Sequence, residues 1–304
     1  MEVGFTIEGL PLEEVISIGG TSINLGRYSA ASVYALAIYD WLISTHDEYD
    51  LIWMTPQWTT IKFAYFICRY YTLLVFPVYL WAWLGDFSME FCKKVVHPLY
   101  GFMPIFQLSS QAVMVIRTYA FTGRSTHVLV FLITCLVVYA AADVWLFGSR
   151  FVVPEELYII FGESGCFAND QSVETQGLWK WSRAVDAGVV MLAAFVMDLF
   201  MMMIIVVHCI RTRSTQGSLG RFFLMQGIVV FISMSILNLW TGINYLSTSR
   251  QWNGTGLPMS LVLSNVLACR LILSLRRRVM PTESHELRLQ SRLVREALQT
   301  SEED

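Results

Sequence analysis

Seven long apolar segments determine what this chain can fold into. Each is close to the ~20 residues that a helix needs to cross the apolar part of a bilayer. The expected positions are about 28–45, 61–84, 98–120, 127–148, 184–208, 221–246 and 257–275. Backbone polar groups in lipid must be hydrogen-bonded within their own segment, and a helix satisfies that condition. The sequence therefore predicts an all-α, integral membrane bundle of seven helices as one domain over 28–275.

The composition agrees with a membrane protein and excludes a nucleic-acid-binding one. Of the 304 residues, 55% are hydrophobic and 15% are charged, whereas ~25% charged residues are usual in a soluble domain. Binding to nucleic acid needs a dense basic surface, and the chain has a net charge of −3 and no such region. The expected surroundings are therefore the lipid bilayer, with the plasma membrane as the expected location.

Basic residues orient the predicted bundle. Lys and Arg are enriched in short loops on the cytoplasmic side, and Arg276, Arg277 and Arg278 directly follow the last apolar segment. We therefore expect a cytoplasmic amphipathic tail over 276–304. Because the number of segments is odd, the N-terminal segment 1–27 is then extracellular. The same orientation places the sequon at Asn253 outside, where it predicts a glycosylation site.

Two of the six cysteines are expected on the outer side. Cys92 precedes the third apolar segment, and Cys166 lies in the long loop between the fourth and fifth segments. The outer compartment is oxidising, which favours disulfides over thiols. The sequence therefore predicts a Cys92–Cys166 disulfide, and two free thiols are the alternative.

Charged residues within the first two segments suggest an ion pair. Asp40 and Arg69 lie at similar expected depths in neighbouring helices. Ionisable groups inside a membrane are costly and usually have a partner. We expect an Asp40–Arg69 pair, with a structural role first and a switch as the alternative.

Polar residues at both ends of the bundle are candidates for function. A pocket open to the outside is predicted from residues expected at the outer ends of the segments. Its candidate residues are Gln107, Asp143, Asp186, Trp240 and Asn244. Asp198 is expected near mid-membrane, either as a buried acid or as an ion-binding group. At the inner ends, Arg117, Tyr119 and Arg270 are candidates for reading out a signal, although Arg270 can also extend to the membrane surface.

Motifs for catalysis, cofactors and metals are absent from the sequence. The five histidines form neither HxxxH nor HExxH, and there is no phosphate-binding glycine loop or nucleophile elbow. We therefore expect no enzymatic activity, no cofactor and no metal site.

Two resemblances extend this interpretation. A cysteine at the outer end of the third segment, a second in the long outer loop, and Arg117 with Tyr119 at the inner end together resemble a G-protein-coupled receptor, although Ile116 stands where such receptors have an acid. The stretches 34–42, 47–53, 62–63 and 69–70 are similar to an uncharacterised family of fungal seven-span proteins, with a domain of unknown function over about 30–75. That resemblance implies a membrane fold and no known ligand.

The expected function is that of a receptor-like sensor. A small-molecule or lipid ligand would bind from the outside, and a cytoplasmic signalling partner would respond at the inner ends. One alternative is a transporter or channel with Asp143, Asp186 and Asp198 along its path. The other is a membrane scaffold without catalytic activity.

Overall fold

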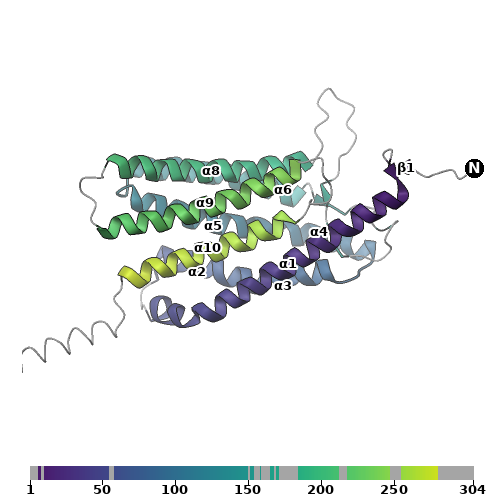
Figure 1. Ribbon diagram of the computed structural model, residues 1–304, viewed down its shortest axis with the longest axis horizontal. Helices are drawn as coiled ribbons and strands as arrows, with labels where there is room; N and C mark the ends of the chain where they lie inside the picture. Colours follow the sequence, from purple (N-terminus) through teal and green to yellow (C-terminus); the bar gives the residue numbers. More distant parts are fainter. Residues whose placement is uncertain are drawn as a thin grey trace, which may run out of the picture.

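The protein is a bundle of long helices, seen from the side in Figure 1. This computed structural model describes residues 6–7, 10–54, 58–149, 151–153, 158, 165–167, 169–170, 184–211, 218–246 and 255–279. The first part of the bundle consists of α1 (Leu12–Glu48), η1 (Tyr49–Trp53), α2 (Thr60–Phe66), η2 (Ile67–Tyr71) and α3 (Thr72–Leu84). The rest consists of α4 (Met89–Gly101), α5 (Met103–Phe121), α6 (Thr126–Ser149), α8 (Ala184–Arg211), α9 (Ser218–Leu246) and α10 (Gly256–Val279).

Two small antiparallel hairpins accompany the helices. The strand β1 (Thr6–Ile7) pairs with β2 (Leu10–Pro11), and β3 (Phe151–Val152) pairs with β4 (Asn169–Asp170). Each strand has two residues, so the fold is helical in all but these short pairings, as the sequence predicts.

Six helical stretches in the described part of the chain are long and apolar enough to cross a membrane. They are Thr60–Leu84, Met89–Phe121, Thr126–Ser149, Asp186–Arg211, Gln226–Leu246 and Gly256–Arg277. The protein is therefore an integral multi-pass membrane protein. These stretches correspond to the second to seventh predicted segments.

The helix α1 differs from the expectation in two ways. It has 37 residues and begins at Leu12, within the segment 1–27 that was expected to precede the membrane domain. It is also absent from the six apolar stretches, because charged and hydroxyl side chains such as Asp40, Ser44 and Glu48 interrupt it. A seventh span and the orientation of the termini therefore stay predictions.

The third predicted segment is two helices. α4 ends at Gly101, Phe102 forms a turn, and α5 begins at Met103 with Pro104 in its first turn. A proline fits the first turn of a helix because its missing N–H has no partner there. The stretch therefore starts at Met89, earlier than the predicted residue 98.

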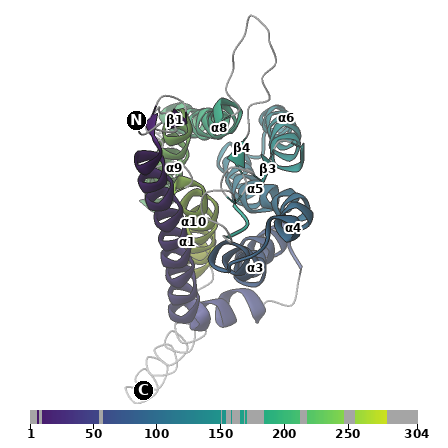
Figure 2. The same cartoon turned by 90° about the vertical axis from the view of Figure 1, so that its right-hand side faces the viewer.

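Helix α5 lies at the centre of the bundle. Figure 2 shows α4, α6 and α10 around it, and α5 also contacts α8. Helix α6 turns apolar side chains such as Val130, Val137 and Val138 outward, as expected for contact with lipid. The helices α8 and α9 approach closely at Gly188 and Gly242, where a Cβ on either glycine would lie 3.3 Å from the carbonyl oxygen of the other.

Two π-helical turns widen the first part of the bundle. They are η1 and η2, and the sequence did not predict either of them. Turns of this kind are rare and are frequent at functional sites. The turn η2 contains Cys68 and Arg69, and both side chains are buried.

Candidate functional site

A cluster of charged side chains joins α1, η2 and α10 at one end of the bundle. We call it the arginine cluster, and it consists of Asp40, Ser44, Glu48, Arg69 and Arg270. Asp40 accepts hydrogen bonds from Arg69 of η2 and from Arg270 of α10. Arg69 also donates to Ser44 Oγ and, at 3.3 Å, to the Asp40 carbonyl oxygen. The Asp40–Arg69 pair expected from the sequence is thus present, with Arg270 as a second partner.

Glu48 completes the charge balance of the arginine cluster. Its Oε2 lies 3.7 Å from Arg69 Nε, and its Oε1 accepts from the Tyr70 hydroxyl and, at 3.1 Å, from Trp53 Nε1. Two carboxylates therefore face two guanidinium groups. The sequence prediction missed Glu48, although Asp40, Ser44 and Glu48 are spaced four residues apart and so share one face of α1.

The last turns of α10 tie the same end to η1. Arg276 Nη1 donates to the Leu51 carbonyl oxygen at 2.8 Å, and its Nη2 donates to Thr59 Oγ1 at 3.1 Å. Arg277 forms an exposed pair with Asp47 at 3.5 Å. Together with Arg270, these contacts fasten α10 to the turn that follows α1.

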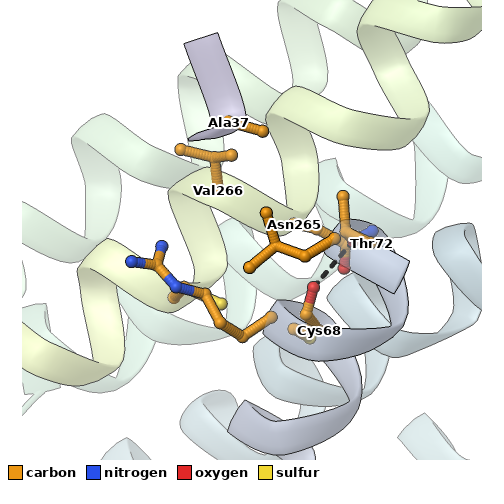
Figure 3. A pocket seen from close by; sticks show the side chains of 8 residues that line it. Ala37, Cys68, Thr72, Asn265 and Val266 are labelled. Atoms are coloured by element: carbon orange, nitrogen blue, oxygen red, sulfur yellow. Dashed lines mark hydrogen bonds between the residues drawn. The ribbon is translucent and has the colours of Figure 1, made fainter. Parts of the chain in front are cut away.

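A cavity of about 10 Å³ lies beside the arginine cluster. Its lining residues are Ala37, Cys68, Arg69, Thr72, Leu73, Asn265, Val266 and Cys269, which come from α1, η2, α3 and α10 (Figure 3). Asn265 donates to the carbonyl oxygens of Phe106 and Leu261, so its amide is held in place. A space of this size accommodates about one water molecule, and it is too small for an organic ligand.

A second polar cluster lies in the middle of the bundle between α5, α8 and α9. We call it the core network, and it consists of Gln107, Gln111, Asp198 and Asn238. Asp198 accepts from Gln111 Nε2 at 3.0 Å and from Asn238 Nδ2 at 2.8 Å. Gln107 Nε2 donates to Asn238 Oδ1 at 3.1 Å. All four side chains are fully buried.

Asp143 lies on α6, which packs against α5 and α8 of the core network, and it is also fully buried. Neither of its carboxylate oxygens has a hydrogen-bond partner in the described part of the chain. Tyr139 precedes it by one turn on α6, and its hydroxyl group is also buried without a hydrogen-bond partner among the described residues. The ion pairs of the described residues include neither Asp143 nor Asp198.

The five residues of the predicted outer pocket do not line a shared opening among the described residues. Gln107 and Asp143 are sealed in the interior, because Gln107 bonds to Asn238 and α6 packs against α5 and α8. Asp186 and Asn244 are half-buried, and Trp240 is 39% exposed. The prediction of an outer pocket is therefore wrong for Gln107 and Asp143. Gln107 hydrogen-bonds to Asn238 in the interior, and Asp143 is buried without a hydrogen-bond partner among the described residues.

The three predicted readout residues are also separated. Arg117 is buried on α5, with its guanidinium 5.3 Å from the Phe121 ring and against Gly227 of α9. Tyr119 is half-buried, whereas Arg270 belongs to the arginine cluster. Arg117 therefore contacts α9, whereas Arg270 contacts α1. The predicted site at Asn253 and the tail beyond Val279 lie outside the described residues.

A disulfide attaches residues 165–167, which we call the cap, to the bundle at the end opposite the arginine cluster. Cys92 of α4 and Cys166 form a disulfide, as expected from their predicted positions, with their Cα atoms 5.1 Å apart. Cys166 N–H donates to the Ala82 carbonyl oxygen at 2.8 Å, and the Phe167 ring stacks on Trp83. These contacts therefore fix the cap to the end of α3.

Replacing Gly165 with alanine is expected to loosen this cap. A Cβ there would lie 2.2 Å from the Trp83 carbonyl oxygen, so the backbone beside Cys166 must shift. We expect a loss of about 1–3 kcal/mol of stability, measured as a lower melting temperature of the purified protein. Gly148→Ala is the control, because nothing lies within 4 Å of that Cβ position. Equal melting temperatures of the two variants would contradict the close contact.

Comparison with known proteins identifies one segment. Residues 28–74 match the model of a family described as "Family of unknown function (DUF6533)". No curated protein and no solved structure matches the chain. The matched segment agrees with the domain of unknown function expected at about 30–75, and it contains every member of the arginine cluster except Arg270. The fungal origin and the likeness to G-protein-coupled receptors stay predictions.

Proposed function

We propose that this integral membrane protein is a receptor-like sensor whose switch is the bond between Asp40 and Arg270. The observation that supports it is one buried carboxylate shared by two arginines from different helices. One arginine belongs to the segment that matches the family, and the other belongs to α10. Both parts of the bundle therefore depend on the same charge.

The two arginines differ in their burial, and this difference makes a switch feasible. The Arg69 side chain is 4% exposed, whereas that of Arg270 is 51% exposed. Arg69 cannot leave Asp40 without losing its closest counter-charge in a buried position, which is costly although Glu48 remains 3.7 Å away. Arg270 can exchange Asp40 for water while Asp40 keeps Arg69. The arrangement therefore favours release of α10 from α1 with the rest of the cluster intact.

The cap at the other end bears on the kind of ligand. The disulfide, the Cys166–Ala82 hydrogen bond and the Trp83–Phe167 stack hold the segment around Cys166 against α3 and α4 at that end. Helix α6 exposes apolar side chains along its length instead. These features favour an amphiphilic ligand that enters from the bilayer over one that enters from water. The protein that responds would bind at the end containing the arginine cluster.

Arg270→Gln is expected to imitate the released state. Deuterium uptake of the full-length protein in lipid nanodiscs should become about five- to tenfold faster at 49–53 and 270–279, because roughly 1 kcal/mol of local stability is lost. Uptake in α5 and α8 should stay unchanged. Arg277→Gln removes an exposed pair of α10 and serves as the control.

The same exchange measurement tests sensing. Wild-type protein in nanodiscs made of one synthetic phosphatidylcholine is compared with the same protein in nanodiscs that also contain a total lipid extract of the producing cell. A sensor of membrane amphiphiles should show altered uptake at 49–53 in the second sample and no longer respond when Arg270 is replaced. Identical uptake in both samples, or faster uptake throughout the Arg270→Gln variant, would argue for a purely structural cluster.

A cation transporter is the second candidate. The observation that favours it is the presence of Asp143 and Asp198 deep in the bundle without cationic partners among the described residues. Intramembrane acids of this kind frequently lie on ion or proton paths. In sealed vesicles, cation flux that is abolished by Asp198→Asn would favour transport over sensing, and absence of flux would favour sensing.

A further inference from the structure

Buried side-chain oxygen atoms without a hydrogen-bond partner lie on the contacting helices α5 and α6. The atoms are Asp143 Oδ1, Asp143 Oδ2, Gln107 Oε1, Gln111 Oε1 and the Tyr139 hydroxyl oxygen. Asp143, Gln107 and Gln111 are fully buried, and Tyr139 is 5% exposed. Buried polar atoms in native proteins nearly always have a partner, so such a group requires an explanation.

The core network explains why these atoms are acceptors. The amide nitrogen of Gln107 is used by Asn238, and that of Gln111 is used by Asp198. Each amide therefore turns its nitrogen toward α8 and α9 and leaves its oxygen without a donor. Tyr139 and Asp143 are four residues apart on α6, so they share one face of that helix.

We propose that Asp143, Tyr139 and Gln107 bind a sodium ion between α5 and α6. Hard cations take several oxygen ligands at once. A proton on Asp143 and the proton of the Tyr139 hydroxyl would together supply only two hydrogen bonds, which leaves further oxygen atoms of this set without a partner. The site has one carboxylate that is free of hydrogen bonds, which matches a single positive charge. Transition metals favour His and Cys ligands, and the described residues contain no group of three or more His, Cys, Asp or Glu side chains suited to a metal.

Asp198 acts as a positioning residue for this site. Its two oxygens are held by Gln111 and Asn238, so it orients the amides and adds negative charge without needing to contact the ion. A bound cation also offsets the cost of a carboxylate in the membrane interior. The inference stands independently of the sensor proposal, because the core network shares no residue with the arginine cluster.

Thermal unfolding of the full-length protein in nanodiscs tests the sodium site. Replacing choline chloride by sodium chloride at about 300 mM should raise the wild-type melting temperature by about 5 °C, because a ligand that binds only the folded state stabilises it. Asp143→Asn should remove this rise. Asp186→Asn should keep it, because Asp186 lies half-buried at the start of α8. Tyr139→Phe should raise the half-maximal sodium concentration by about tenfold.

Three outcomes would overturn the proposal. The first is equal stability of the wild type in sodium and choline, and the second is a sodium effect that survives Asp143→Asn. The third is a melting temperature that changes with pH but not with sodium. If this pH response is lost in Asp143→Asn, the site holds a proton and not a sodium ion. Where Asp143→Asn does not fold, an unchanged sodium response of Tyr139→Phe decides against the site.

Discussion

Asp40→Asn is expected to destabilise the protein by about 3 kcal/mol. Removing one member of a buried ion pair typically costs ~3–5 kcal/mol, because it leaves an uncompensated buried charge. The lower value applies here because Glu48 remains 3.7 Å from Arg69 and compensates part of that charge. The melting temperature of the purified protein should fall by about 5–10 °C on this scale. The yield of folded protein should fall with it.

Two further variants distinguish the effect of breaking the buried Asp40–Arg69 pair from the effect of removing any acidic residue. Asp47→Asn breaks an exposed contact with Arg277 and should cost less than about 1 kcal/mol. Adding Arg69→Gln to Asp40→Asn removes the unpaired charge and should restore part of the stability. A double variant no more stable than Asp40→Asn would show that the charge of Arg69 is not what destabilises it.

Removal of the disulfide is expected to have the largest effect of all. The bridge closes a loop with a sequence separation of 74, and a closure of this size stabilises a protein by roughly 4 kcal/mol through restriction of the unfolded chain. The variant Cys92→Ala/Cys166→Ala should therefore melt about 8–15 °C below the wild type. The measurement is thermal unfolding without reductant.

The wild type under reducing conditions provides an independent comparison. Its melting temperature should approach that of Cys92→Ala/Cys166→Ala, while the variant itself should not respond to reductant. Cys135→Ala, which removes a free and half-buried cysteine, should stay close to the wild type. A double variant as stable as the wild type would mean that the contacts of Gly165 and Phe167 hold the cap without the bridge.

Features that depend on length and depth could be predicted from the sequence. Six apolar stretches, the partnership of Cys92 with Cys166 and the pairing of Asp40 with Arg69 follow from how far along a helix each residue lies. Depth alone does not give the direction in which a side chain points around its helix. For that reason Arg270 was expected to extend to the surface as one alternative, although it reaches Asp40 of another helix.

The predicted pocket shows the same limit for polar residues. The sequence indicates that Gln107, Asp198 and Asn238 are polar residues in an apolar setting, and a cavity is one way to accommodate them. In the structure they hydrogen-bond to one another across three helices. These contacts join residues as far as 131 positions apart, and no local pattern encodes them. The widened turns η1 and η2 could not be predicted either, because each has only five residues and is too short to show a period of its own.

The position of Arg69 has a consequence for how the chain enters the membrane during synthesis. Helix α1 is less apolar than the six stretches, and Asp40 is the one charged residue within its predicted membrane segment 28–45, which opposes insertion. Arg69 follows only 29 residues later, whereas Arg270 follows 230 residues later. We therefore expect α1 to be retained in the bilayer together with α2–η2–α3 as a neutralised helical hairpin, long before α10 is made. Translation halted before residue 69 should leave the first helix poorly inserted, and translation halted after residue 84 should not.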